Sequence, residues 1–216
     1  MISHTLTIDS VVFESRGKSI LSDIYLHCVT GKTTALIGKN GSGKSCLMNI
    51  IAQQIHPLSK SIRIDNRPIG SIYPHITYLP QYLFIPGHLN IRKVFKDIHI
   101  ATGPFMEQFP AFTRKINTPL KRLSTGERRL VEVYAIIKAP CIFSLLDEPF
   151  TQIMPVHQER MIHLLKEETT KGFLIADHLY QQLLPISSYC YLLKEGKSWN
   201  IENKEQLKDF GYIQHF

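Results

Sequence analysis

Residues 38–45 read Gly-Lys-Asn-Gly-Ser-Gly-Lys-Ser and fit the pattern G-x-x-x-x-G-K-[ST], which indicates a site for a nucleoside triphosphate. Glycines let the backbone amides of such a loop approach phosphate oxygens closely. Lys44 is placed to reach the β- and γ-phosphates, and the Ser45 hydroxyl can ligate Mg²⁺. A chance glycine-rich turn is the alternative, but residues 34–37 predict a buried strand and residues 46–53 predict a helix whose N-terminal end faces the anion. The loop residues expected to bind the nucleotide are Gly38, Asn40, Gly41, Ser42, Gly43, Lys44, Ser45 and Cys46.

A pair of acids, Asp147 and Glu148, follows an apolar run at residues 142–146. Such a run predicts a buried parallel strand, and open α/β sheets bind their ligands at the carboxyl ends of these strands. We expect Asp147 to hold Mg²⁺ and Glu148 to orient and polarise the attacking water, because phosphoryl transfer depends on positioning and charge stabilisation. Acids are also common at solvated strand ends, but the phosphate loop in the same chain favours the catalytic interpretation.

Residues 123–127 read Leu-Ser-Thr-Gly-Glu and support two interpretations. Ser124 and Glu127 have the spacing of a capping box, which is sufficient to explain the start of a helix. The same helix start, with the Ser124 hydroxyl and the Gly126 amide, can also bind an anion. Taken alone, the motif favours the cap.

Three single residues gain meaning only beside these motifs. His178 follows an apolar run at residues 173–176 and could hydrogen-bond a γ-phosphate, although it is one of ten histidines and could be an ordinary surface residue. Gln81 could place its carbonyl oxygen on Mg²⁺ or be a solvated loop amide. Phe13, near the end of an expected strand, could stack on a nucleotide base or belong to the core.

The elements that must position these residues alternate along the chain. We expect strands at residues 6–13, 19–29, 34–37, 61–65, 76–79, 141–146, 173–176, 189–193 and 198–201, and helices at residues 46–53, 89–98, 125–138, 157–171 and 204–210. This alternation predicts an α/β fold with a sheet that is parallel at its centre.

Composition narrows the class of protein. A chain of 216 residues with 44% hydrophobic and 20% charged residues can bury one core with a small inserted subdomain. A net charge of +7 would suit nucleic acid, an anionic membrane surface or polyphosphate, and the lack of a continuous basic block disfavours nucleic acid. The four cysteines lie far apart without C-x-x-C spacing, as is usual for reduced thiols in a cytosol. With no apolar stretch of transmembrane length and no signal peptide evident, we expect a soluble chain.

The order of these motifs resembles that in the nucleotide-binding subunit of an ATP-binding cassette (ABC) transporter, and the resemblance covers nearly the whole chain. The matches are Walker A at residues 38–45, the Q-loop at Gln81, the signature at residues 123–127, Walker B at residues 145–149, the switch histidine at His178 and the adenine-stacking aromatic at Phe13.

The resemblance implies a P-loop ATPase core with a mainly parallel sheet, an antiparallel β flank and a short inserted helical subdomain. It divides the chain into a core of residues 1–81 and 139–216 and a helical subdomain of residues 82–138. It further implies that two subunits sandwich two ATP molecules with Mg²⁺, that Walker A of one faces the signature of the other, and that closure drives an integral membrane permease. We therefore expect a cytoplasmic protein, peripheral on the cytosolic face of the membrane, with residues 82–98 docking a permease helix and no nucleic-acid partner.

Four departures from the family pattern bear on activity. Thr125 replaces a signature glycine, and Glu127 is a tolerated replacement of the glutamine. Residues 152–154 contain no D-loop aspartate, which puts coupling between the two sites in doubt. Cys46 replaces the usual threonine beside the Mg²⁺ serine, and the segment between Gln81 and the signature is short.

Three hypotheses follow from the resemblance. The first is the ATPase subunit of a membrane transporter. The second is a soluble ABC ATPase acting on ribosomes or DNA, which would usually carry paired cassettes or long coiled-coil insertions that this chain lacks. The third is a degenerate, mainly ATP-binding subunit with a more active partner, favoured by Thr125 and the altered D-loop and opposed by the intact Lys44, Asp147, Glu148 and His178.

Overall fold

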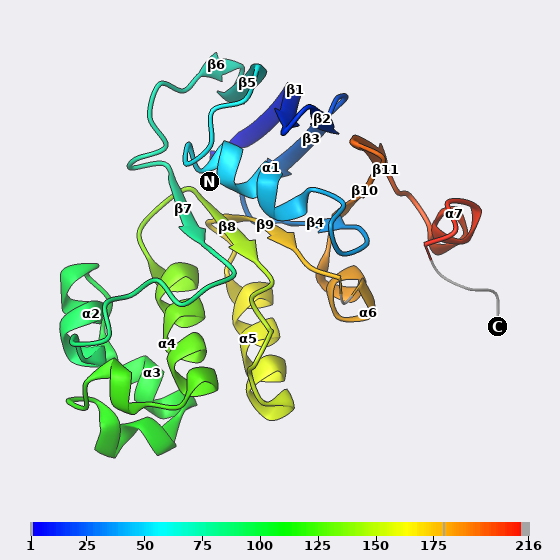
Figure 1. The fold of residues 1–216 in the computed structure, drawn as a ribbon. Coiled ribbons are helices and arrows are strands. Elements are labelled where there is room, and N and C mark those ends of the chain that lie inside the picture. Colours follow the sequence, from blue (N-terminus) through cyan, green and yellow to red (C-terminus); the bar gives the residue numbers. More distant parts are fainter. Residues whose placement is uncertain (1, 179, 213–216) are drawn as a thin grey trace.

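A six-stranded sheet forms the centre of the computed structural model, which describes residues 2–178 and 180–212 (Figure 1). Its strands, in spatial order, are β11 (Lys197–Asn200), β10 (Tyr189–Lys194), β4 (Thr33–Ile37), β9 (Gly172–Ala176), β8 (Phe143–Asp147) and β7 (Ile76–Leu79). The strands from β10 to β7 run parallel, and β11 closes an antiparallel hairpin onto β10. Strands β4, β8 and β9 are buried along their whole length, as expected for a parallel sheet covered on both faces.

A second, antiparallel sheet lies beside the first. It contains β1 (Thr5–Ser15), β2 (Lys18–Leu21), β3 (Tyr25–Val29), β5 (Ser59–Ile64) and β6 (Arg67–Pro68). Together with helix α1 (Lys44–Ile51), this sheet packs on the face of the central sheet that carries Leu36, Leu145 and Leu174. The predicted α/β class, with a parallel centre and an antiparallel flank, is confirmed.

Helices cover the opposite face, which carries Ala35, Ile37 and Leu146. They include α4 (Thr125–Lys138) and α5 (Pro155–Glu167), with the helical lobe of α2 (Ile91–Asp97) and α3 (Thr102–Gln108) outside α4 (Figure 1). The 3-10 helices η1 (Pro110–Lys115) and η2 (Leu120–Arg122) complete the lobe, and near the C-terminus lie α6 (Tyr180–Leu183), η3 (Leu184–Ile186) and α7 (Lys204–Asp209).

Aromatic rings hold the helical lobe together. Phe105 lies against Phe95, Phe112 and Tyr134, with ring centroids 5.1, 5.1 and 4.8 Å away. Residues 82–138, proposed from the sequence as a subdomain, contain α2 to α4, and their buried side chains join one continuous cluster with Ile37 of the central sheet. The division into two structural units therefore stays a prediction.

One expectation about secondary structure was wrong, and one helix was missed. The single strand at residues 19–29 is two strands, because the amides of Ser22 and Asp23 leave the sheet and donate to the Gly196 carbonyl at 2.8 and 3.3 Å. Helix α3 was not predicted, since it contains Gly103 and Pro104. Both lie in its first turn, where a missing amide donor costs no helical hydrogen bond.

Candidate functional site

A cleft of about 590 Å³ gathers most of the site residues proposed from the sequence. Its lining residues are Phe13, Ser15, Ile20, Asn40, Gly41, Gly43, Lys44, Ser45, Cys46, Ile55, Gln81, Glu148 and His178. Ser15, Ile20 and Ile55 were missed, because they belong to no phosphate-binding pattern and reach the cleft only through the fold. The cleft lies beyond the carboxyl ends of the central strands, as expected for an open α/β sheet.

The phosphate loop connects β4 to α1 and needs its glycines for two different reasons. Gly43, the N-cap of α1, has a φ of 104°, which residues with a side chain rarely adopt. Gly38 has no room for a side chain, because a Cβ there would lie 2.6 Å from Ser42 Oγ and 2.7 Å from the Leu193 carbonyl oxygen. Gly38 and Ser42 do not line the main cleft; Ser42 lines a neighbouring hollow on the other side of the loop.

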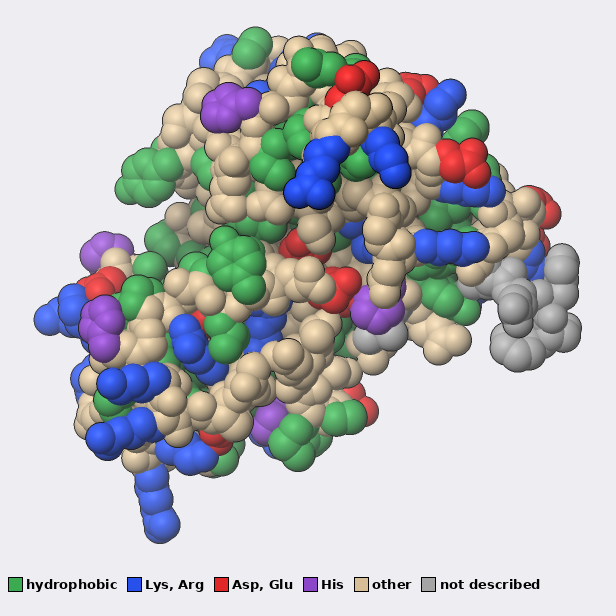
Figure 2. All heavy atoms as spheres, viewed as in Figure 1, with side chains coloured by type: hydrophobic (Ala, Val, Ile, Leu, Met, Phe, Trp, Pro, Cys, Tyr) green, Lys and Arg blue, Asp and Glu red, His purple; other side chains and the backbone are tan. Residues whose placement is uncertain are grey.

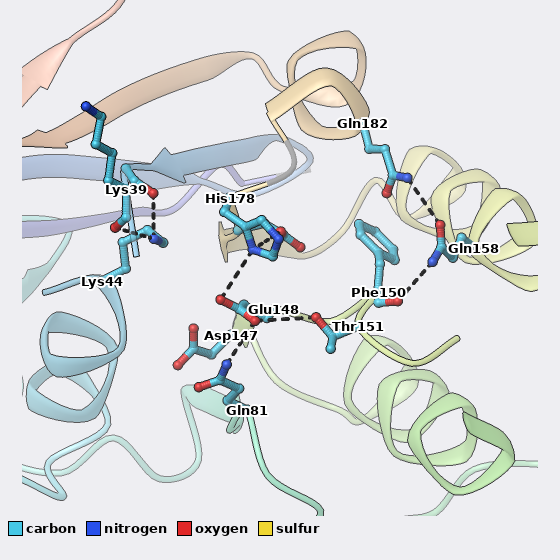
Figure 3. Close-up of polar contacts among 12 residues, drawn as sticks. Lys39, Lys44, Gln81, Asp147, Glu148, Phe150, Thr151, Gln158, His178 and Gln182 are labelled. Atoms are coloured by element: carbon cyan, nitrogen blue, oxygen red, sulfur yellow. Dashed lines mark hydrogen bonds and ion pairs between the residues drawn. The ribbon is translucent and has the colours of Figure 1, made fainter. Parts of the chain in front are cut away.

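Lys44 is folded inward at the first position of α1 (Figure 3). Its Nζ donates to the carbonyl oxygens of Gly38 and Lys39, at 2.7 and 3.2 Å. Burial lowers the pKa of Lys44, while the carboxylates of Glu148, Asp147 and Asp177 oppose that shift. The ammonium group is thus enclosed by carbonyl oxygens that phosphate oxygens can replace.

Glu148 is the centre of the polar contacts in the cleft (Figure 3). Its carboxylate accepts hydrogen bonds from Gln81 Nε2 at 2.9 Å and from Thr151 Oγ1 at 3.4 Å, and it lies 3.5 Å from His178 Nδ1. The backbone of Glu148 is left-handed, with a φ of 46°. A non-glycine residue in this region is uncommon and often marks a functional site. Thr151 was not proposed from the sequence, where a threonine three residues after an acid carries no signal.

Asp147, the last residue of β8, lies beneath Glu148 with 1% exposure. Neither carboxylate oxygen has a hydrogen bond of ordinary geometry within the described residues. Burial raises the pKa of Asp147 to about 6, although the nearby Ser45 hydroxyl and Lys44 ammonium oppose the shift. A buried carboxylate without a donor beside a serine hydroxyl suits a hard cation.

A cation here could not depend on protein ligands alone. Within residues 2–178 and 180–212, no group of three or more His, Cys, Asp and Glu side chains is arranged to hold a metal ion. Mg²⁺ is commonly bound by one or two carboxylates, with waters and substrate phosphates as the other ligands. The residues present therefore fit Mg²⁺ that arrives with a nucleotide.

The signature segment begins α4 and lies outside the cleft. The capping-box interpretation is confirmed, because Ser124 Oγ accepts from the Glu127 amide at 3.2 Å and Glu127 accepts from the Ser124 amide at 2.9 Å. A Cβ on Gly126 would lie 2.4 Å from the Gln152 carbonyl oxygen, so the glycine lets the start of α4 pack against the D-loop segment. Neither Ser124 nor Gly126 lines the cleft that contains Lys44.

The D-loop segment has its own support. Gln158 of α5 donates to the carbonyl oxygens of Phe150 and Ile153 at 3.0 and 2.8 Å, and Gln182 of α6 donates to Gln158 at 3.2 Å (Figure 3). Met154 and Val156 are exposed at its end. This segment therefore presents apolar side chains where the family pattern has an aspartate.

The first residues of the segment 82–98, which was expected to dock a permease helix, are only partly exposed. Tyr82 is 64% and Phe84 is 38% exposed, whereas Ile85 is buried. Ile85 is drawn inward because its amide donates to buried Glu132 at 3.1 Å and its carbonyl accepts from Arg128.

Comparison with known proteins yields one family model and many relatives. The model described as ABC transporter matches residues 21–151. The chain is 25% identical over 226 residues to the lipopolysaccharide export system ATP-binding protein LptB of Acidithiobacillus ferridurans, an alignment that covers 96% of this chain and 94% of the relative. It is 27% identical over 213 residues to LptB of Escherichia coli K12, covering 89% of this chain and 88% of that protein.

Solved structures agree on the fold. An ATP-binding subunit of an ABC transporter superposes with a TM-score of 0.82 at 18% identity, covering 96% of this chain and 93% of that one. A bacterial Atm1-family ABC exporter with ATP bound also gives a TM-score of 0.82, at 17% identity, with 97% of this chain matched to 41% of the exporter.

Proposed function

The chain belongs to the ABC transporter family of ATP-binding, ATP-hydrolysing subunits, and on that premise we propose that two such subunits close around two MgATP and drive a membrane permease. The observation that carries the proposal is the Glu148 carboxylate, held by Gln81 and His178 in the same cleft as Lys44. An acid that positions the attacking water and a lysine that binds the phosphates supply the positioning and charge stabilisation on which phosphoryl transfer depends.

The main residues of the cleft each have a chemical task in this proposal. Lys44 and the loop amides bind the phosphates, and Phe13, half-buried beside Ile20, stacks on the base. The Glu148 carboxylate accepts a proton from the water that attacks the γ-phosphorus, and the bond from that phosphorus to the bridging oxygen breaks. His178 donates a hydrogen bond to the γ-phosphate. When the phosphate leaves, this bond is lost and the histidine moves relative to Glu148.

Mg²⁺, when bound with the nucleotide, neutralises charge on the phosphate oxygens. Ser45, Gln81 and Asp147 are the residues proposed to hold it. The buried carboxylate of Asp147, which has no hydrogen bond of ordinary geometry among the described residues and lies near the Ser45 hydroxyl, supports this assignment.

The second subunit would complete the site. Ser124 and Gly126 do not line the cleft of their own chain, so we assign them to the ATP bound by a partner subunit. The Ser124 hydroxyl already accepts the cap hydrogen bond, and its proton remains available for a phosphate oxygen. Thr125 weakens the closed dimer, because its side chain replaces a glycine that lets the backbone approach the phosphate closely. The apolar D-loop weakens it as well, because it lacks the charged contact of an aspartate.

The permease would dock on the helical lobe. Tyr82 and Phe84 offer exposed aromatic surface directly after Gln81. Residues 82–138 contain ten Lys and Arg against four Asp and Glu, so this segment carries +6 of the net charge of +7. Figure 2 shows Lys and Arg side chains gathered over the lobe that contains α2 and α3. Such a surface favours an acidic cytoplasmic segment as its partner.

A permease partner also implies where in the cell the protein is located. Among the described residues, no helix is both long and apolar enough to cross a membrane. We propose that the chain is attached peripherally to the cytosolic face through its permease.

The experiment that tests the proposal is ATP turnover by the purified chain at increasing protein concentration. A dimeric site predicts that activity per subunit rises with concentration and is lost in the Glu148→Gln variant. If ATP binds but no turnover occurs at any concentration, the chain is instead an ATP-binding subunit that needs an active partner.

A further inference from the structure

A buried ion pair on α4 has no part in the tasks assigned above. Arg129 and Glu132 lie one helical turn apart, with 2% and 0% exposure, and Arg129 Nη1 is 4.0 Å from Glu132 Oε2. Burying charged groups is unfavourable unless hydrogen bonds compensate for the lost water. The hydrogen-bond partners of these two side chains therefore indicate what they do.

Arg129 binds backbone carbonyls at the ends of β7 and β8, two of the strands that lead into the cleft. Its Nη1 donates to the Pro80 carbonyl at 2.6 Å, and Pro80 directly precedes Gln81. Its Nη2 donates to the carbonyls of Asp147 and Glu148 at 2.8 and 3.1 Å. One guanidinium thus contacts the peptide groups that carry Gln81 and Glu148.

The bond between Nη2 and two successive carbonyls explains an unusual backbone. The φ torsion of Glu148 is defined by the carbonyl carbons of Asp147 and Glu148, and it has the left-handed value of 46°. A non-glycine residue keeps this conformation only where its surroundings hold it. By binding the carbonyls on both sides of the bend with the same nitrogen, Arg129 fixes the direction in which the Glu148 side chain leaves the backbone.

Glu132 binds the chain that follows Gln81. Its Oε1 accepts hydrogen bonds from the amides of Phe84 and Ile85, both at 3.1 Å. Arg128, on the same helix, donates to the Ile85 carbonyl. The exposed Phe84 ring therefore stands on a backbone that is tied to α4.

We propose that Arg129 is a positioning residue for Glu148 and Gln81, and that Glu132 fixes residues 84–85 to the same helix. This inference rests on the proposed function, because it assigns to α4 the connection between the signature, the Glu148 acid and residues 84–85. The helix begins at Ser124, so a displacement of the signature by the partner's ATP would move the attacking acid and the docking segment together.

The chain offers a matched control for a purely structural role. Lys171 is also buried, and its Nζ donates to three backbone carbonyls at the other end of α4, at Ile136, Ile137 and Ala139. Lys171, which directly precedes β9, is outside α4, so Lys171→Met removes a buried cation that binds the same helix without touching the cleft. Its effect on folding should match that of Arg129→Gln, whereas its effect on turnover should not.

The first test is the kinetics of ATP hydrolysis at a temperature where every variant is folded. We expect Arg129→Gln to lower kcat by at least about tenfold with KM changed less than about threefold, and Lys171→Met to change neither. The kcat of Arg129→Lys, which keeps the charge but not the forked geometry, should lie between those of the wild type and Arg129→Gln.

A double variant tests whether Arg129 acts through Glu148. In the Glu148→Gln background, Arg129→Gln should cause no further loss of turnover, because it acts through the missing carboxylate. Equal losses in Arg129→Gln and Lys171→Met, or no loss in either, would overturn the positioning role.

The second test does not depend on activity, so it separates failure of this inference from failure of the proposed function. Hydrogen exchange of the peptide containing Phe84 and Ile85 should become at least about tenfold faster in Glu132→Met, whose side chain fills a similar volume. Exchange should stay close to wild type in Glu132→Gln, which keeps an acceptor oxygen, and in Lys171→Met. Unchanged exchange in Glu132→Met would overturn the role of Glu132 even if the chain hydrolyses ATP normally. A wild-type chain without turnover but with this exchange pattern would instead contradict only the proposed function.

Discussion

The side-chain amide of Gln81 donates a 2.9 Å hydrogen bond to the carboxylate of Glu148, and this bond joins the ends of two neighbouring parallel strands. The amide nitrogen faces the acid, which leaves the carbonyl oxygen of Gln81 for a cation (Figure 3). If MgATP binds as proposed, Gln81 has to keep both contacts or exchange one for the other. In the proposed function, the position of Glu148 would therefore depend on whether Mg²⁺ is bound, and the residue after Gln81 would begin the segment that docks the permease.

Replacing Glu148 with Gln should stop turnover without weakening ATP binding. An amide keeps the shape of the side chain but cannot accept a proton from water, a contribution of about 10²–10⁴-fold in rate. The measurements are phosphate release and binding of a fluorescent ATP analogue. Thr151→Val is the control, since it removes only the weaker 3.4 Å bond to the same carboxylate and should leave most activity. Unchanged turnover in Glu148→Gln would mean that another residue or subunit supplies the base.

Replacing Lys44 with Ala should abolish tight MgATP binding. The change removes the main cationic contact to the phosphates, and a charge-assisted hydrogen bond contributes roughly 1.5–3 kcal/mol. Titration calorimetry of wild type and variant measures the loss. Lys39→Ala is the matched control, because this neighbouring lysine is exposed and points away from the cleft (Figure 3). If Lys44→Ala binds as tightly as wild type, the phosphates bind elsewhere.

Contiguous motifs explain why so much of the cleft was predictable from the sequence. The phosphate loop and the acid pair lie directly after buried strands, and strands of a parallel sheet end at one edge, so Lys44 and Glu148 had to meet. The same logic placed Gln81 and His178 beside them.

Contacts to the backbone were not predictable. Arg129 binds the carbonyl of Pro80, which is 49 residues away in sequence. Every residue has a backbone carbonyl, so the sequence does not show which one a side chain will bind. The break between β2 and β3 likewise depends on the distant Gly196 carbonyl. An arginine following Arg128 on the polar start of a helix is expected to be solvated, so its complete burial could not be read from the pattern.

The nucleotide-free protein should be stabilised by Asp147→Asn above pH 6. Burial raises the pKa of Asp147 to about 6 in the folded chain, from an ordinary value of 3.8. Between these values the folded state binds more protons than the unfolded state, so the contribution of Asp147 to stability decreases as pH rises and is fully unfavourable above pH 6. The difference corresponds to about 3 kcal/mol at most.

Urea unfolding in EDTA at several pH values measures this effect. The advantage of Asp147→Asn should be largest at pH 7 to 8 and should shrink as pH falls from about 6 to about 4. Equal stability of variant and wild type at every pH would show that the carboxylate is not strained by burial. Glu148→Gln, measured in parallel, controls for the loss of a neighbouring charge.

Thr125→Gly should strengthen the ATP-dependent dimer. Thr125 is the exposed first residue of α4, where the family pattern has a glycine that approaches the partner's ATP. Sedimentation of Glu148→Gln with ATP should show a monomer with a weak dimer, and the dimer should increase when Thr125→Gly is added. Gly126→Ala is the opposing control, because its Cβ would lie 2.4 Å from the Gln152 carbonyl oxygen and disturb the signature. A stable dimer without nucleotide, or no effect of Thr125→Gly, would contradict the assigned role.

The segment that follows Gln81 should cross-link to the permease in membranes. Tyr82 and Phe84 are exposed, so cysteines placed there should react with a cytoplasmic helix of the partner. Ile85→Cys is the internal control, since Ile85 is buried and should not react. Tyr73→Cys tests specificity, because Tyr73 is even more exposed than Tyr82 and Phe84 but lies on the loop before β7. Cross-links from Tyr82→Cys and Phe84→Cys that change in yield with ATP would support docking beside the Q-loop, as a γ-phosphate-dependent shift of Gln81 requires. With a functional complex in hand, cross-linking from Tyr73→Cys alone would move the docking surface to the other side of β7 and leave the ATPase assignment intact.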